Sequence, residues 1–288
     1  MRTIKQVQAV YFSPTGTTKR VVTHVAREIA KALHASYNEQ DFTLPKTRTA
    51  PLTFGSDDLV VFGTPVYAGR VPNVLLKYLA TIAGNGALAV PVTVFGNRNY
   101  DDALVELRDI LVQGGLYPIA AAAFVGEHSF SRVLAKDRPD MQDMEIATVF
   151  ARSVAGKCTQ LVPERAPDPV NVTGRPLPYR GYYMPQDRHG NPVDIRKVKP
   201  LTNDRCNDCG LCVKVCPMGS INPDNVKEIT GICIKCGACI KKCPKDAKYY
   251  DDAGYLYHQR ELEETYTRHR CNRWNDCRYF GSVVPCAV

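Results

Sequence analysis

Residues 206–244 read CNDCGLCVKVCPMGSINPDNVKEITGICIKCGACIKKCP, and this stretch decides how the C-terminal part of the chain folds. It contains the pattern C-x-x-C-x-x-C-x-x-x-C-P twice. The first copy consists of Cys206, Cys209, Cys212 and Cys216, and the second of Cys233, Cys236, Cys239 and Cys243. A glycine follows the second cysteine of each copy, at Gly210 and Gly237. The chain therefore carries one cysteine motif in duplicate.

Thiolates at this spacing can converge on one iron-sulfur cube, and the fourth cysteine of such a run ligates the cluster of the other run. We therefore predict two ligand sets: Cys206, Cys209, Cys212 with Cys243, and Cys233, Cys236, Cys239 with Cys216. A zinc site would explain C-x-x-C pairs, but neither the third cysteine at the same spacing nor the proline after each copy. A disulfide framework is disfavoured because we expect no secretory signal in this chain.

Residues 201–253 closely resemble bacterial ferredoxins that carry two 4Fe-4S clusters, and all eight ligand positions fit the pattern of that family. The resemblance implies a small α+β domain. After the second motif, residues 247–257 are rich in tyrosine and are compatible with a strand pair that closes this domain. Residues 258–270 predict a polar helix within a C-terminal segment that covers residues 254–288.

Residues 5–162 alternate apolar runs typical of strands with amphipathic segments of helical length. This alternation predicts a parallel sheet covered by helices. The expected strands are 7–12, 34–42, 59–62, 88–95 and 118–125, and the expected helices are 17–35, 73–83, 101–113 and 141–161. Five such strands fit a flavodoxin-like doubly wound sheet, in which ligands bind at the carboxyl ends of the strands. We therefore assign residues 1–162 to an α/β domain.

Three loops follow strands of this domain at the edge where a ligand is expected. Residues 13–18, Ser-Pro-Thr-Gly-Thr-Thr, connect a strand to a helix and offer hydroxyl and backbone N–H groups to a phosphate. A threonine-rich helix cap without a ligand is the competing interpretation. Residues 63–72 carry Tyr67 between two prolines, and residues 96–102 carry Tyr100 among polar groups. Either tyrosine is a suitable platform for a flat ring.

Together the three loops resemble the phosphate loop and the two ring loops of flavodoxins, and this resemblance covers about 160 residues. It implies that FMN is a cofactor and that its phosphate is held by Ser13, Thr15, Gly16, Thr17 and Thr18. It further implies that the flavin ring is bordered by Thr64, Pro65, Val66, Tyr67, Gly69, Asn97, Arg98 and Tyr100. Tyr100 is the expected stacking residue and Tyr67 the second choice. His128, which follows the fifth strand, is expected to be a solvated loop residue, with an approach to the flavin as the alternative.

Residues 163–200 contain eight prolines and predict a linker between the two domains. Tyr179, Tyr182 and Tyr183 alternate with arginines in this linker. We expect them to pack across a domain joint, although binding of an external partner is the alternative. Four cysteines are not needed by the clusters, namely Cys158, Cys271, Cys277 and Cys286. Their spacing matches no standard metal site, and plain thiols are expected.

The composition is that of a soluble protein with two domains, since the 288 residues are 44% hydrophobic and no apolar run is long enough to span a bilayer. We expect a cytoplasmic location, where cysteines stay reduced. The formal charge of +8 does not predict a nucleic-acid partner, because two clusters and a flavin phosphate each contribute roughly −2. The loaded protein would then be close to neutral.

The chain resembles flavodoxin-ferredoxin fusion proteins over most of its length. This resemblance predicts an electron-transfer protein that relays electrons between FMN, two 4Fe-4S clusters and a soluble redox protein or ferredoxin-dependent enzyme. Two alternatives remain open. The first is an enzyme that reduces a small molecule at the flavin with His128 as proton donor, and the second is a redox sensor that docks through its C-terminal tail.

Overall fold

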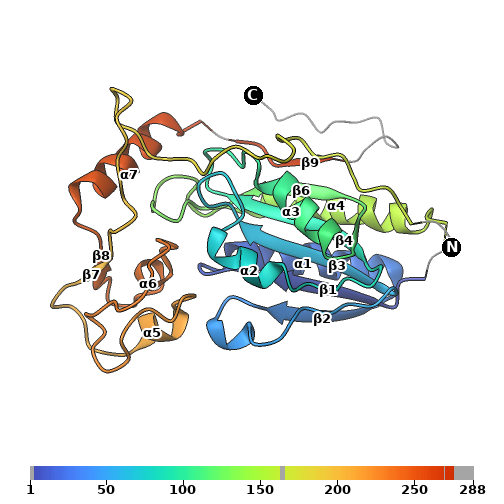
Figure 1. The fold of residues 1–288 in the computed structure, drawn as a ribbon, viewed down its shortest axis with the longest axis horizontal. Coiled ribbons are helices and arrows are strands. Elements are labelled where there is room, and N and C mark those ends of the chain that lie inside the picture. Colours follow the sequence, from blue (N-terminus) through green and yellow to red (C-terminus); the bar gives the residue numbers. More distant parts are fainter. Residues whose placement is uncertain (1–2, 163–165, 269, 276–288) are drawn as a thin grey trace.

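The computed structural model describes residues 3–162, 166–268 and 270–275, with only the backbone of 273–275. Among these residues a larger α/β part contains a seven-stranded sheet, and a smaller C-terminal part contains a two-stranded sheet. Figure 1 shows the smaller part at one end of the larger part, beside the loops that connect its strands and helices.

The central sheet is built from β1 (Gln6–Tyr11), β2 (Ser36–Asp41), β3 (Asp58–Pro65), β4 (Leu88–Phe95) and β6 (Ala121–Val125). These strands are parallel and lie in the order β2-β1-β3-β4-β6, which is the order of flavodoxin-like doubly wound folds. Strands β1, β3, β4 and β6 are almost wholly buried, as continuous apolar runs in a parallel sheet require. The predicted fold class is confirmed.

Two short strands extend this sheet beyond the expected five. The segment predicted as one strand at 118–125 is divided into β5 (Tyr117–Pro118) and β6. Residues 119–121 lie opposite only Val90 and Pro91 of β4, and the missing N–H of Pro91 interrupts regular pairing. At the other side of β6, β9 (Arg273–Asn275) pairs antiparallel as an edge strand. No local pattern in the sequence indicated β9.

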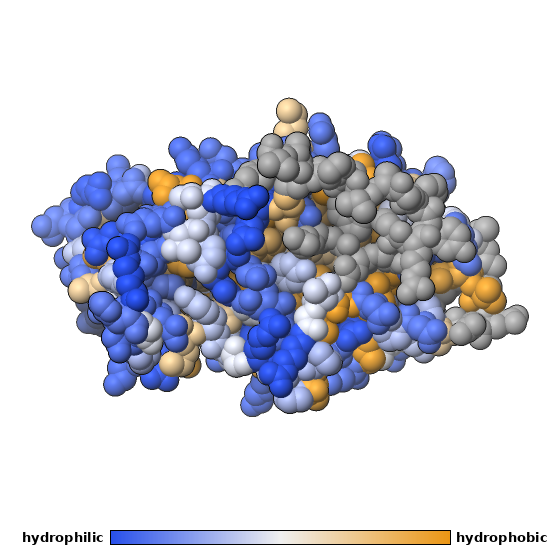
Figure 2. Space-filling model, turned by 90° about the horizontal axis from the view of Figure 1, so that it is seen from above, coloured by the Kyte–Doolittle hydropathy of each residue, from blue (hydrophilic) through white to orange (hydrophobic). Residues whose placement is uncertain are grey.

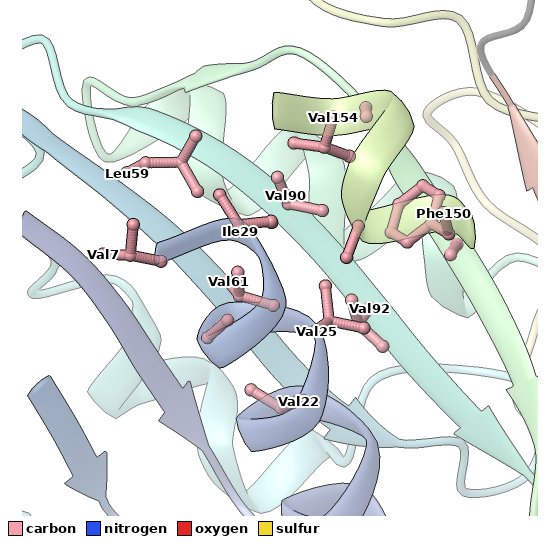
Figure 3. Close-up of a cluster of buried hydrophobic side chains, with 14 of the residues drawn as sticks. Val7, Val22, Val25, Ile29, Leu59, Val61, Val90, Val92, Phe150 and Val154 are labelled. Carbon is pink, nitrogen blue, oxygen red and sulfur yellow. The ribbon is translucent and has the colours of Figure 1, made fainter. Parts of the chain in front are cut away.

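Helices cover both faces of the sheet. On one face, α1 (Thr17–Leu33) and α4 (Met141–Cys158) pack on the apolar side chains of β1, β3 and β4. Figure 3 shows Val22, Val25 and Ile29 of α1 meeting Phe150 and Val154 of α4 over these strands. The other face is covered by η2 (Asn73–Leu75), α2 (Leu76–Leu79) and α3 (Ala103–Gln113), with η1 (Pro45–Thr47) in the loop after β2.

Helix α2 is shorter than the helix expected at 73–83. The N–H of Ala83 donates to the carbonyl of Leu52 (2.9 Å), and the N–H of Phe54 donates to the carbonyl of Ala83 (2.9 Å). These bonds place Ala83 in a bridge with Thr53. A residue paired in this extended way cannot continue a helix, so long-range pairing ends the helix early.

The smaller part consists of β7 (Leu201–Thr202), α5 (Leu211–Val215), α6 (Ala238–Lys241) and β8 (Lys248–Tyr249), with β7 and β8 antiparallel. Helices α5 and α6 occupy equivalent places in the two cysteine motifs. Each begins after a glycine with left-handed backbone geometry, since φ is 69° at Gly210 and 72° at Gly237. Only glycine adopts this conformation without a steric penalty, which explains why both motifs contain it.

The last helix, α7 (Ala253–Thr265), corrects two expectations. The strand pair expected at 247–257 is limited to β8, and the helix expected at 258–270 begins and ends five residues earlier. The side chain of Asp252 accepts a hydrogen bond from the N–H of Tyr255 (2.8 Å) and caps the helix. This N-cap outweighs the β propensity of the tyrosines that follow.

The linker is packed against the larger part, as expected. The guanidinium of Arg70 lies over the rings of Tyr179 (4.6 Å) and Tyr182 (5.0 Å), and that of Arg98 lies over Tyr183 (4.3 Å). Further along, the Arg188 side chain forms salt bridges with Glu261 and Glu264 of α7. The linker therefore contacts both the larger part and α7.

Figure 2 shows one face of the molecule, on which most of the coloured surface is hydrophilic and apolar side chains lie between the polar ones. In the described part of the chain, no helix is long and apolar enough to cross a membrane.

Candidate functional site

A cavity opens at the carboxyl ends of β1, β3, β4 and β6, where a doubly wound sheet places its ligand. The loops after all four strands contribute to its wall. The lining residues are Pro14, Thr15, Thr17, Thr18, Pro65, Val66, Tyr67, Val94, Phe95, Gly96, Glu127, His128 and Ser129. The cavity thus combines hydroxyl groups that follow β1 with an aromatic ring that follows β3.

The loop before α1 has the geometry of an anion site. Gly16 adopts φ 99° and immediately precedes the helix, and an added Cβ would meet no atom within 4 Å. Ser13 does not line the cavity. Its hydroxyl accepts from the N–H of Lys19 (2.9 Å), and its own N–H donates to Thr43 (2.8 Å), so Ser13 holds the loop in shape. The first turn of α1 contains no acidic residue, which leaves the positive end of the helix dipole open to a phosphate.

The second loop presents Tyr67 to the cavity. Tyr67 and Arg70 exchange two backbone hydrogen bonds (3.0 and 3.1 Å), which close a tight turn around Ala68 and Gly69. Behind the loop, the hydroxyl of Thr64 is buried and has no hydrogen-bond partner among the described residues. Thr64 is fully buried and is not among the residues that line the cavity. Gly69 faces Asp101 rather than the cavity.

The third loop is turned away from the cavity. Tyr100 packs on Phe95 (ring centroids 5.6 Å apart) in a small core cluster, and Arg98 pairs with Asp101 and lies over Tyr183. The amide of Asn97 donates to the carbonyls of Tyr266 (2.7 Å) and Arg268 (3.0 Å). These three residues therefore engage the linker, the core and the segment after α7. Tyr67, and not Tyr100, is the tyrosine placed at the cavity.

The variant Asn97→Ala tests whether Asn97 holds the segment after α7, a role that we call the clamp, or binds the flavin. Asn97 is buried and also accepts from the N–H of Arg270 (3.2 Å), so alanine leaves three backbone groups of the segment after α7 unpaired. We expect faster hydrogen exchange at the Arg270 amide and destabilisation by about 1 kcal/mol, the size of a typical hydrogen bond, because Arg268 and Arg270 are exposed and water can replace the lost partner. FMN affinity should stay near that of the unchanged protein. A large loss of affinity with unchanged exchange would contradict the clamp.

The loop after β6 contributes residues that the sequence-based site omitted. Glu127, His128 and Ser129 all line the cavity. The expectation that His128 is a solvated loop residue is wrong, because the ring packs against Gly96 and Phe130. Burial, together with nearby Lys241, His258 and Arg98, lowers the pKa of His128 to about 3. The sequence could have predicted all three as site residues, because their loop follows a strand that ends at the same edge of the sheet.

Two further cavities are lined by cysteines. One contains Cys216, Cys233, Cys236 and Cys239, and the other contains Cys206, Cys209, Cys212 and Cys243. Each cavity thus gathers three cysteines of one motif and the fourth cysteine of the other. Apolar side chains such as Ile221, Ile229 and Ile234 line the first cavity, and Leu211 and Val226 line the second. Four sulfurs within an apolar shell suit an iron-sulfur cube.

The sulfur atoms differ in their surroundings. The N–H of Ser220 donates to the sulfur of Cys216 (3.4 Å), and the N–H of Ala247 donates to that of Cys243 (3.3 Å), so the fourth cysteines of both motifs receive equivalent bonds. Burial raises the pKa of Cys236 to about 12 and also raises that of Cys239. These thiols are therefore protonated until a positive centre binds them.

The remaining cysteines show no common site in the described residues. Cys158 is buried at the end of α4 and belongs to the core cluster beneath it. Cys271 takes part in a disulfide, so the expectation of a plain thiol is wrong for this residue. The spacing of cysteines does not reveal which of them a fold brings together. Cys277 and Cys286 lie outside the described residues.

The smaller part contacts the larger part next to the cavity at the carboxyl ends of the strands, which we call the strand-edge cavity. Lys241 of α6 pairs with Glu127 and donates to the carbonyl of His128 (2.6 Å). Arg132 donates to Asp246 (2.9 Å), and Arg48 donates to the carbonyl of Pro217 (2.7 Å). The loops that line the strand-edge cavity are thus held against the motif that carries Cys239.

Comparison with known protein families supports the smaller part of the chain. Residues 205–248 match the family described as 4Fe-4S dicluster domain. No curated protein matches the chain.

Among solved structures, a flavodoxin from Streptococcus pneumoniae TIGR4 is 20% identical, with 53% of this chain and 99% of that chain covered and a TM-score of 0.38. A flavodoxin from the domain Archaea is 12% identical, with coverages of 54% and 99% and a TM-score of 0.39. An azoreductase from Bacillus anthracis is 14% identical, with coverages of 54% and 100% and a TM-score of 0.37. The strand order and the cysteine motifs together show that the chain joins a flavodoxin-like sheet to a C-terminal 4Fe-4S dicluster domain.

Proposed function

We propose that this protein is an electron-transfer protein that relays electrons between FMN, two 4Fe-4S clusters and an external redox protein. The observation that supports it best is that one chain contains two cavities lined by four cysteines each and a third at the strand ends with hydroxyl groups and an aromatic ring. When bound, FMN supplies a carrier of one or two electrons, and each cluster supplies a carrier of one.

The residues of the strand-edge cavity fit FMN. Thr15, Thr17 and Thr18 lie at the start of a 17-residue helix and can donate to a phosphate. Tyr67 and the apolar residues Val66 and Val94 form walls suited to a flat ring. Ser13 and Gly16, which were expected to hold the phosphate, do not line the cavity, and we propose that they shape the phosphate loop instead. Asn97, Arg98 and Tyr100 support the site from behind.

The alternative of an enzyme with His128 as proton donor receives less support. A pKa of about 3 keeps the imidazole neutral at neutral pH. The ring nitrogen Nδ1 accepts from the N–H of Phe130 (3.1 Å), so the single ring proton resides on Nε2. A neutral imidazole is a poor acid, although it can donate one hydrogen bond into the cavity. The sensor alternative depends on the tail, most of which lies outside the described residues.

The test of the proposal is anaerobic purification with iron, sulfide and flavin measured on the same sample. About eight irons, eight sulfides and one FMN per chain are expected for two cubes and one flavin. Iron at that level without flavin, even after FMN is added, would remove the flavin from the proposal. Flavin reduction by a ferredoxin with no turnover of small oxidants would favour the carrier over the enzyme.

Thr17→Val tests the phosphate loop in particular. Valine keeps the methyl group that lies against Gly126, but removes the hydroxyl that lines the cavity. A hydrogen bond to a charged group contributes about 1.5–3 kcal/mol, so the Kd for FMN should rise about tenfold or more. Fluorescence titration of flavin-free protein measures this change. Thr159→Val, at the far end of α4, is the matched control, and an equal loss in both variants would contradict the assignment.

A further inference from the structure

We propose that the flavin exchanges electrons directly with the cluster held by Cys216, Cys233, Cys236 and Cys239, and that the other cluster is the contact for an external one-electron donor or acceptor protein. This inference rests on the proposed function and adds an order to the relay. We name the first cluster the inner cluster and the second, held by Cys206, Cys209, Cys212 and Cys243, the outer cluster.

Tyr67 lies in the wall of the strand-edge cavity, which we call the flavin cavity, and also packs on a core cluster that a residue of the inner cysteine cavity contacts. It lines the flavin cavity and belongs to the side chains that pack with Ile234 on the core cluster beneath the loop. Ile234 in turn lines the inner cysteine cavity. Tyr67 and Ile234 thus pack on the same core cluster, while each of them lines one of the two cofactor cavities.

A backbone contact forms the second connection. A Cβ placed on Gly237 would lie 2.5 Å from the carbonyl oxygen of Ser129. Gly237 directly follows Cys236, and Ser129 lines the flavin cavity. Only a residue without a side chain permits this approach. The glycine therefore lets the inner motif touch the wall of the flavin cavity.

Charged contacts hold this junction on the side of α6. Lys241 binds both Glu127 and the carbonyl of His128, two residues of the cavity wall. Its side chain is only 13% exposed, which makes the contact stronger than a surface ion pair. Lys214 occupies the equivalent place in the first motif and is exposed on α5. The two motifs are therefore alike in sequence but differ in what they touch.

The outer cluster is the more accessible one. Cys209 is exposed, whereas its counterpart in the second motif, Cys236, is 7% exposed. Cys209 lines the outer cavity. An external protein can therefore approach this cluster from the exposed side of Cys209.

The proposed relay conserves electrons at every step. Each transfer oxidises one centre by one electron and reduces the next by one. Two successive transfers from a one-electron donor protein through the outer and inner clusters convert FMN to its two-electron reduced form, and water supplies the protons. The reverse sequence delivers two single electrons to an acceptor protein.

The internal repeat offers a matched experiment for the inner cluster. Gly237→Ala and Gly210→Ala both place a side chain at a similar positive φ and so carry a similar backbone strain. Only the first meets Ser129, since Gly210 has nothing within 4 Å. The flavin of the loaded protein is reduced by a laser flash, and its reoxidation by the clusters is followed by absorbance. Gly237→Ala should slow this step several-fold, with iron and flavin contents unchanged, and Gly210→Ala should keep the original rate.

A second matched pair covers the case in which Gly237→Ala loses its cluster. Lys241→Met removes the anchor on the cavity wall and should slow the same step, whereas Lys214→Met should not. Equal rates in both members of each pair would overturn the order that we propose. Failure of the unchanged, fully loaded protein to exchange electrons between flavin and clusters would instead overturn the proposed function.

The outer contact is tested with a reduced small ferredoxin as the one-electron donor. Charge reversal beside a docking site changes the association rate, so Lys214→Glu should alter the second-order rate of cluster reduction several-fold. Lys31→Glu, at the end of α1 and far from the motifs in sequence, is exposed and serves as the control. A change in the control alone, or no change in either variant, would contradict the outer cluster as the contact.

Discussion

Cys216→Ala is expected to remove the same cluster as Cys236→Ala, although the two cysteines belong to different motifs. Cys216 lines the cavity that contains Cys233, Cys236 and Cys239, whereas Cys243 lines the other. Each substitution should lower the iron content from about eight to about four per chain, because one cube has lost a ligand. Electron paramagnetic resonance of the reduced variants should then show the same remaining cluster in both.

The complementary pair provides the control. Cys243→Ala and Cys209→Ala should share a spectrum with each other, and this spectrum should differ from that of the first pair. If Cys216→Ala instead matches Cys209→Ala, each motif holds its own cluster and the crossed ligand sets are wrong. Flavin content should stay constant in the four variants, since none of these cysteines lines the flavin cavity.

Glu106→Ala is expected to cause a large loss of stability in the larger part. The Glu106 carboxylate is 3% exposed and accepts from two nitrogens of Arg70 (2.7 and 2.8 Å) and from the N–H of Val71 (2.8 Å). Alanine leaves the guanidinium, which is 12% exposed, without its partner. Breaking a buried pair in this way costs about 3–5 kcal/mol. Anaerobic urea unfolding followed by circular dichroism measures the change.

Two controls test whether the loss of stability comes from the charge of Glu106 and whether it depends on the burial of the ion pair. Glu106→Gln keeps the size of the side chain and an acceptor for Val71, so it should lose less stability than alanine. Asp57→Ala breaks the Lys5–Asp57 pair, in which the side chains are 73% and 50% exposed, and should leave stability unchanged. A loss below about 1 kcal/mol for Glu106→Ala would show that Arg70 relaxes into solvent instead.

The expected effects at Arg70 also bear on the linker. Its guanidinium lies over Tyr179 and Tyr182 and donates to the carbonyl of Arg180 (2.6 Å). Loss of Glu106 should therefore loosen residues near 180 as well as the loop at 67–71. This coupling explains how a proline-rich segment without regular structure keeps a defined path along the larger part.

Local patterns in the sequence were sufficient for the architecture. Alternating apolar and amphipathic segments predicted the parallel sheet, because burial on both faces requires unbroken apolar strands. The cysteine spacing predicted the dicluster domain, because three thiolates at i, i+3 and i+6 are close in any short turn-rich segment. A phosphate loop at residues 13–18 could be proposed because a glycine and hydroxyl residues lie between a strand and a helix.

The tertiary structure decided which of the candidate residues face the cavity. Tyr100 and Asn97 follow the right strand, but Phe95 and the segment after α7 compete for them and turn them away. Ser129 and Gly237 meet although 108 residues separate them, and no local pattern records such a contact. By itself, therefore, the sequence determined the fold and the cysteine motifs, which depend on neighbours along the chain. Packing alone decided the walls of the flavin cavity and the position of each motif beside it, since these depend on residues that meet only after folding.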